Sequence, residues 1–96
     1  MSPRRTRDLA AALLRKGFGR DNTHHEMYWL YVGGKRTSVR TRISHGAREY
    51  GDSLLGQMAR QLGLTRSEYD DLIECPMGGT EYVRLLTERG RIGHGP

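Results

Sequence analysis

The chain has 96 residues, with 16 basic and 11 acidic side chains and a net charge of +5. That length suits one domain with a modest core. The chain has a single cysteine, Cys75, so an intrachain disulfide is excluded. No apolar run is long enough for a signal peptide or a membrane span. We therefore expect a cytoplasmic protein with no membrane partner, and the basic excess favours a polyanion such as nucleic acid as the partner.

Apolar spacing near the N-terminus predicts a helix over about residues 4–16, which Gly17 would end. A short strand candidate follows at 18–20. Two longer strands are predicted at about 23–32 and 35–43, because aromatic and β-branched residues dominate both segments. Gly33-Gly34 lies between them and is typical of a hairpin turn. Residues 44–51 are predicted to form a loop.

The second half of the chain is predicted to be helical. Glycines mark where two of the helices end, at Gly63 and at Gly90. Thr65 and Glu68 have the spacing of a capping box, in which two side chains and two backbone N–H groups bond reciprocally at a helix start. The predicted helices cover about 52–62, 65–74 and 80–89, and a frayed tail follows over 91–96.

This order of elements predicts an α+β fold, in which helices cover one face of a small antiparallel sheet and the other face stays open. We expect a domain over residues 1–75 and a C-terminal helical extension with a tail over residues 76–96. The apolar face of the last helix would either complete the core or form the seam of a homodimer, and we favour the first. The open face of the sheet is where we expect function.

Two hairpin registers compete, and they differ in which side chains reach the open face. A two-residue loop at Gly33-Gly34 would pair Tyr28 with Val39 and place Glu26 on the core face, where an unpaired carboxylate is costly. A three-residue loop with a glycine bulge would instead pair Trp29 with Val39. We prefer the second register, because its core face contains no carboxylate.

The preferred register predicts the two faces of the sheet. Its core face comprises Met27, Trp29, Tyr31, Thr37, Val39, Thr41 and Ile43. Its open face comprises His24, Glu26, Tyr28, Leu30, Ser38, Arg40 and Arg42. His24 is then exposed among arginines while His25 points inward, and in the other register the two histidines exchange roles.

An imidazole beside guanidinium groups combines a proton carrier near neutral pH with cations that bind phosphate bidentately. We therefore take His24 as the candidate catalytic residue. The candidate RNA-binding residues are His25, Tyr28, Arg36, Arg40 and Arg42, of which Tyr28 would stack on a base. No spacing of histidine, cysteine or carboxylate suggests a metal site, so we expect neither a metal nor a cofactor. The competing interpretation is an ordinary polar strand, since exposed arginines also protect a strand from aggregation.

The order and spacing of these motifs resemble the sequence pattern of the HicA-type toxins of toxin–antitoxin pairs. The likeness covers about residues 8–73. It is carried by the helix end Leu13 to Phe18, by Asn22-Thr23-His24-His25, by the segment 53–64 and by Thr65 to Tyr69.

The resemblance implies a double-stranded-RNA-binding-like α-β-β-β-α fold and a metal-independent endoribonuclease that cleaves single-stranded mRNA. It implies His24 as the catalytic histidine, because the first histidine of the pair has that role in the family. It also implies a HicB-like antitoxin as protein partner. The RNA 2′-hydroxyl would be the nucleophile, and the expected product is a 2′,3′-cyclic phosphate.

Two other functions compete with this prediction. The same basic face could belong to an RNA-binding module without turnover, which would bind RNA in a salt-dependent way. Residues 58–69 also have the alanine and glycine spacing of a helix-turn-helix DNA binder. Against this, the would-be recognition helix carries four carboxylates that phosphates would repel, from Glu68, Asp70, Asp71 and Glu74.

Overall fold

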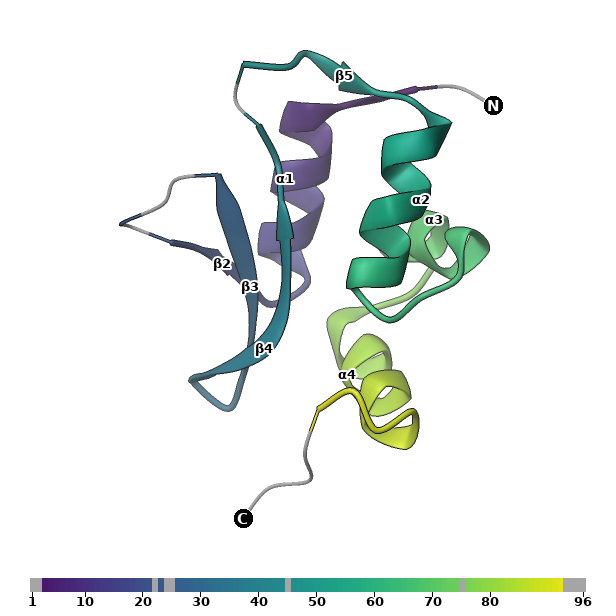
Figure 1. Ribbon diagram of the computed structural model, residues 1–96. Helices are drawn as coiled ribbons and strands as arrows, with labels where there is room; N and C mark the ends of the chain where they lie inside the picture. The colour runs from purple at the N-terminus through teal and green to yellow at the C-terminus, as the bar shows by residue number, and fades with distance from the viewer. Residues whose placement is uncertain (1–2, 22, 24–25, 45, 75, 93–96) are drawn as a thin grey trace.

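The computed structural model describes residues 3–21, 23, 26–44, 46–74 and 76–92 (Figure 1). Strands β2, β3 and β4 form a three-stranded antiparallel sheet in that order, and β1 pairs with β5 in a separate two-stranded ribbon. The fold is therefore α+β, as predicted. The elements in chain order are β1 (Arg4–Arg5), α1 (Thr6–Arg15), β2 (Phe18–Arg20), β3 (Met27–Val32), β4 (Lys35–Arg42), β5 (Glu49–Tyr50), α2 (Asp52–Gln61), α3 (Arg66–Glu74) and α4 (Gly79–Glu88).

The helices lie to one side of the three-stranded sheet, to its right in Figure 1. Helix α1 packs against β2, α2 packs against β4, and α3 contacts both α1 and α2. The opposite face of the sheet is not covered by a helix in the described part of the chain. The prediction of one covered and one open face is therefore confirmed.

Local sequence signals set the ends of the helices. The predicted capping box forms at the start of α3, where the Thr65 N–H donates to Glu68 Oε1 at 2.9 Å and the Glu68 N–H donates to Thr65 Oγ1 at 3.2 Å. Gly63 and Gly90 follow α2 and α4 with φ angles of 77° and 70°, in the left-handed region that favours glycine. The predicted ends of these helices are thus confirmed.

Several boundaries differ from prediction. The strand predicted from about residue 23 begins at Met27 in the described part of the chain. Helix α1 begins only at Thr6, because Arg4 and Arg5 pair with residues 49–50, which were predicted as loop. The predicted frayed tail is wrong for its first two residues. The Arg91 N–H donates to the Leu86 carbonyl at 2.9 Å, and Ile92 is only 9% exposed.

Helix α4 belongs to the same hydrophobic core as the sheet. Tyr82 and Leu86 are fully buried in the cluster that also contains Leu13 and Leu30. The Tyr82 ring stacks on Phe18 of β2 with ring centroids 6.0 Å apart, and its hydroxyl donates to the Leu62 carbonyl at 2.8 Å. Burial raises the pKa of Tyr82 well above its usual range. The last helix therefore completes the core.

The hairpin register differs from the preferred prediction. The turn consists of two residues, Gly33 and Gly34, with φ angles of 60° and 81°, and Val32 pairs with Lys35 across it. Further along the hairpin, an irregularity shifts the pairing so that Tyr28 lies opposite Thr41. The predicted three-residue loop is therefore wrong, and the core and open faces of β3 are exchanged.

The physical reason lies at the turn and at Glu26. Two consecutive left-handed residues form the tight turn whose twist matches that of a hairpin, and two glycines adopt it without strain. The cost assigned to a buried Glu26 does not arise, because its side chain is 37% exposed and accepts a hydrogen bond from Arg42 Nε at 2.8 Å. Tyr28 and Leu30 are instead the fully buried side chains of β3.

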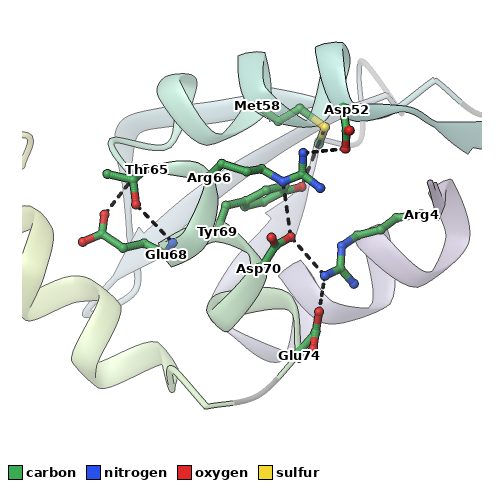
Figure 2. A network of polar contacts seen from close by, with 9 residues as sticks. All are labelled: Arg4, Asp52, Met58, Thr65, Arg66, Glu68, Tyr69, Asp70 and Glu74. Carbon is green, nitrogen blue, oxygen red and sulfur yellow. Dashed lines mark hydrogen bonds and ion pairs between the residues drawn. The ribbon is translucent and has the colours of Figure 1, made fainter. Parts of the chain in front are cut away.

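A chain of ion pairs joins β1 to the helices. Arg66 donates to Asp52 at 3.0 Å and to Asp70 at 3.3 Å, and Arg4 donates to the same Asp70 oxygen at 3.0 Å (Figure 2). Arg4 also pairs with Glu74 at the end of α3. These arginines are neutralised by carboxylates within the fold, which assigns them a structural role.

A separate ion pair, between Arg89 and Glu68, shifts the pKa of the Glu68 carboxyl group. Arg89 donates to both carboxylate oxygens of Glu68, at 2.8 and 2.6 Å, and with the Thr65 N–H it lowers the pKa of Glu68 from 4.5 to about 2. Since this pKa is lower in the folded than in the unfolded chain, the pair stabilises the fold above about pH 4.5 and this contribution is lost as the pH falls toward 2. We expect Arg89→Gln to raise the pKa of Glu68 toward its ordinary value in an NMR titration.

Arg84→Gln is the matched control, because it removes an arginine from α4 that has no carboxylate within 4.0 Å among the described residues. The control should leave the pKa of Glu68 where it is in the unmodified protein. A pKa that stays near 2 in Arg89→Gln would show that Arg89 is not its cause.

Candidate nucleic-acid interface

The open face of the sheet is built around Trp29, in the central strand β3. Trp29 lies opposite Gly19 of β2 on one side and opposite Arg40 of β4 on the other. Alternation along the strands sends Met27 and Tyr31 to the same face. The exposed side chains of β4 on this face are Arg36, Ser38, Arg40 and Arg42.

Two guanidinium groups lie over the Trp29 ring. The Arg36 Cζ is 4.3 Å from the ring centroid and the Arg40 Cζ is 5.1 Å from it, both within cation–π range. Each such contact contributes about 0.5–1 kcal/mol at an exposed site. The indole thus holds two long side chains in place and lowers the conformational entropy that they would lose on binding a ligand.

The indole N–H of Trp29 is a buried donor without an acceptor among the described residues. Leaving such a donor unsatisfied costs about 1–3 kcal/mol.

The three arginines of this face differ in their charge partners. Arg42 Nε donates to Glu26 at 2.8 Å, and Arg36 lies 3.8 Å from an Asp21 carboxylate oxygen. Arg40 donates to the Ser38 carbonyl at 3.3 Å, and no carboxylate lies within 4.0 Å of it in the part of the chain that the structure describes. Arg40 is therefore the cation of this face with the most charge left to offer an anion.

Tyr31 adds a second aromatic ring to the face. Tyr31 is 41% exposed, and its ring lies across Gly19. A Cβ built on Gly19 would be only 2.8 Å from Tyr31 Cε1, so a larger residue at position 19 would collide with the ring. A glycine in β2 thus makes room for the ring. Exposed aromatic rings beside arginines are typical of surfaces that stack nucleobases and hold the backbone between them.

A hollow of about 270 Å³ borders the face along the edge strand β4. Gln61, at the end of α2, forms its far wall and accepts a hydrogen bond from Thr41 Oγ1 at 2.7 Å. The remaining lining residues are Met27, Ser38, Arg40 and Arg42. The open face therefore continues into a groove that contains two of the predicted phosphate-binding arginines.

The outcome for the predicted site residues is mixed. Arg36, Arg40 and Arg42 are exposed on the open face. Tyr28 is wrongly predicted, because its ring is fully buried beneath the helices and is not accessible to a base. The predictions for His24 and His25 lie outside the described residues.

Trp29 was not predicted as a site residue. The largest apolar side chain of the strand was assigned to the core, and the predicted faces of the sheet followed from that assignment. The two glycines of the turn were the signal that could have corrected it, since they fit a two-residue loop that turns Trp29 outward.

The described residues contain no metal cluster and no membrane-spanning helix. No three histidine, cysteine, aspartate or glutamate side chains gather closely enough to hold a metal ion within the described ranges. No described helix combines the length and apolar character needed to cross a bilayer.

Comparison with protein-family models, with curated proteins and with solved structures finds no match for the chain.

Proposed function

We propose that this protein binds single-stranded RNA on the open face of its sheet and cleaves it as a HicA-type endoribonuclease. The observation that carries the binding part is the Trp29 ring held under Arg36 and Arg40. An aromatic ring offers a sequence-tolerant stacking surface, and the adjacent guanidinium groups offer phosphate contacts. The net charge of +5 favours the same class of ligand.

The fold supports the proposal in its order of elements. Helix α1, the three antiparallel strands and helix α2 follow one another as in a double-stranded-RNA-binding-like domain, and we propose that fold for this part of the chain. Under the toxin proposal the protein acts in the cytoplasm, and a HicB-like antitoxin would cover the open face.

The proposed cleavage uses the RNA as its own nucleophile. The 2′-hydroxyl oxygen bonds to the adjacent phosphorus while the bond from phosphorus to the 5′-oxygen breaks. His24 either removes the 2′-hydroxyl proton or donates a proton to the leaving 5′-oxygen, and a water molecule makes the other of these two proton transfers. Arg40 and Arg42 stabilise the charge that develops on the phosphate oxygens. The products are a 2′,3′-cyclic phosphate and a 5′-hydroxyl, and DNA is not cleaved because it lacks the nucleophile.

Replacing Trp29 by alanine tests the binding part. We expect Trp29→Ala to weaken the binding of a single-stranded RNA oligomer by about 1–3 kcal/mol, the usual contribution of one stacked base. The measurement is a fluorescence-anisotropy titration with a labelled oligomer. Trp29→Phe keeps an aromatic ring and should retain most of the affinity. Unchanged affinity in Trp29→Ala would contradict the proposed interface.

Expression in cells tests the toxin part. We expect growth arrest when the protein is produced alone, relief of the arrest when the neighbouring open reading frame is co-expressed, and loss of the arrest in His24→Ala. Growth that is unaffected by the unmodified protein would contradict the toxin assignment without bearing on RNA binding.

An RNA-binding module without turnover is the second candidate, since the contacts of Trp29 with Arg36 and Arg40 would serve RNA binding whether or not cleavage follows. It predicts salt-dependent RNA binding and intact RNA after long incubation with purified protein. A helix-turn-helix function is disfavoured by α3, because its exposed Asp71 would be repelled by the DNA phosphates. Duplex DNA should therefore compete poorly with RNA.

A further inference from the structure

A second basic surface lies away from the open face, where β1 and β5 pair beside the first turn of α1. The pairing brings two segments together that are distant in the sequence, at the top of the molecule in Figure 1. Between them is a hollow of about 540 Å³. It is lined by Arg5, Thr6, Arg7, Ala47, Arg48 and Glu49.

The charges around this hollow are unbalanced. Three arginines face one carboxylate, and Arg5, Arg7 and Arg48 are all exposed. None of the three has a carboxylate within 4.0 Å among the described residues. In contrast, Arg4 lies next to them and forms ion pairs with Asp70 and Glu74. Alternation along β1 explains the difference, because consecutive side chains point to opposite sides of a strand.

The backbone that carries these arginines is fixed. The Thr6 N–H donates to the Arg48 carbonyl at 2.9 Å, and Thr6 Oγ1 donates to the Ala47 carbonyl at 2.7 Å. Thr6 itself is only 9% exposed. Three guanidinium groups are therefore presented from a rigid frame around one opening, which suits a polyanion with multiple oxygen atoms.

The hollow is connected to the sheet in two ways. Arg42, the last residue of β4, precedes Arg48 by six residues in the sequence, and β5, which follows Arg48, lies at the top of the molecule in Figure 1. A neighbouring hollow of about 400 Å³ shares Thr6 and Arg7 with the first and extends between α1 and the covered face of the sheet to Arg20, at the end of β2. This second hollow lies on the helix side of the sheet, so the route from the open face to the arginine hollow is the one past Arg42.

We propose that Arg5, Arg7 and Arg48 bind a backbone phosphate of the same RNA strand that the open face holds. This inference rests on the proposed function and extends it, because it adds a second anchor and lengthens the RNA footprint. A strand that passes Arg42 would reach the hollow at the end of the sheet. Short oligomers would engage only one of the two surfaces.

The test compares RNA oligomers of about 4 and about 12 nucleotides, within the range that single-stranded-binding domains cover. We expect the double variant Arg5→Gln/Arg48→Gln to bind the longer oligomer about tenfold more weakly. The slope of log affinity against log salt should fall by about 0.7 for each phosphate that the variant no longer binds. Affinity for the shorter oligomer, held at Trp29, should stay unchanged. Arg84→Gln with Arg60→Gln is the charge-matched control, and thermal melting checks that each variant is folded.

The possible results separate this inference from the proposed function. If Trp29→Ala loses RNA affinity while the double variant binds both oligomers as tightly as the unmodified protein, the second anchor does not exist and the proposed interface stands. If the unmodified protein binds no RNA, both proposals fail. A titration with inorganic phosphate, followed through the arginine Nε resonances, shows whether the hollow binds a free anion instead of RNA. Phosphate binding at Arg5 and Arg48 without any effect of the double variant on RNA would assign the hollow to a free anion and overturn the inference.

Discussion

Replacing His24 by alanine is expected to lower the rate of RNA cleavage by about 10²–10⁴-fold, the usual contribution of general acid–base catalysis. RNA affinity should not change, because the stacking and phosphate contacts of the proposed interface come from Trp29, Arg36 and Arg40. The measurement is the initial cleavage rate at saturating RNA, with the 2′,3′-cyclic phosphate identified by mass spectrometry.

Three other variants make this result specific. His45→Ala removes another histidine of the chain and should cleave at the unmodified rate. Trp29→Ala should show the opposite pattern, with a higher KM and a retained kcat, because it removes binding that substrate and transition state share. Cleavage by His24→Ala at the unmodified rate would sink the catalytic assignment. A loss in His25→Ala instead would transfer the role to the second histidine.

Replacing Tyr82 by alanine is expected to destabilise the whole fold by about 3–5 kcal/mol, the usual cost of deleting a buried aromatic ring. The ring is fully buried, stacks on Phe18 and bonds through its hydroxyl to the Leu62 carbonyl. Because Phe18 belongs to β2 and Leu62 follows α2, the loss should be felt by the sheet and the helices together. Urea unfolding followed by circular dichroism measures it.

Tyr82→Phe keeps the ring and removes one hydrogen bond to a buried carbonyl, so we expect a smaller loss of about 1 kcal/mol. Thr80→Ala, at an exposed position of the same helix, should change the stability by no more than about 0.5 kcal/mol. A single unfolding transition is expected for all three variants. Two separate transitions would show that α4 folds independently of the sheet.

The helices could be predicted closely because their signals are local. The capping box at Thr65 and Glu68 and the glycines at 63 and 90 act within a few residues of the chain. Such signals are readable without knowledge of the tertiary structure. The α+β class followed, since amphipathic helices flanking strands leave few alternatives.

The faces of the sheet could not be predicted, because alternation gives two solutions and the choice depended on one energetic argument. That argument treated Glu26 as buried and unpaired, whereas Arg42 pairs with it at the rim of the sheet. The error moved Trp29 into the predicted core. It also placed Tyr28 on the surface, and the ring is fully buried.

The pairing of β1 with β5 was beyond sequence analysis for another reason. Each strand has only two residues, so neither shows a periodic pattern, and the contact joins positions separated by α1 and the whole three-stranded sheet. The hollow between Arg5 and Arg48 exists only through this long-range contact. Composition indicated the excess of basic residues. Only the fold shows that Arg4 pairs with carboxylates whereas the neighbouring Arg5 has no carboxylate within 4.0 Å among the described residues.

Trp29 is the only tryptophan in the chain. All of the protein's indole fluorescence therefore originates at the centre of the open face, between two guanidinium groups. A nucleobase or a protein partner that arrives there changes the surroundings of that one fluorophore, and an event elsewhere on the molecule leaves its emission as it was. The molecule thus carries a built-in optical probe, which separates occupancy of the sheet from occupancy of the arginine hollow without any label.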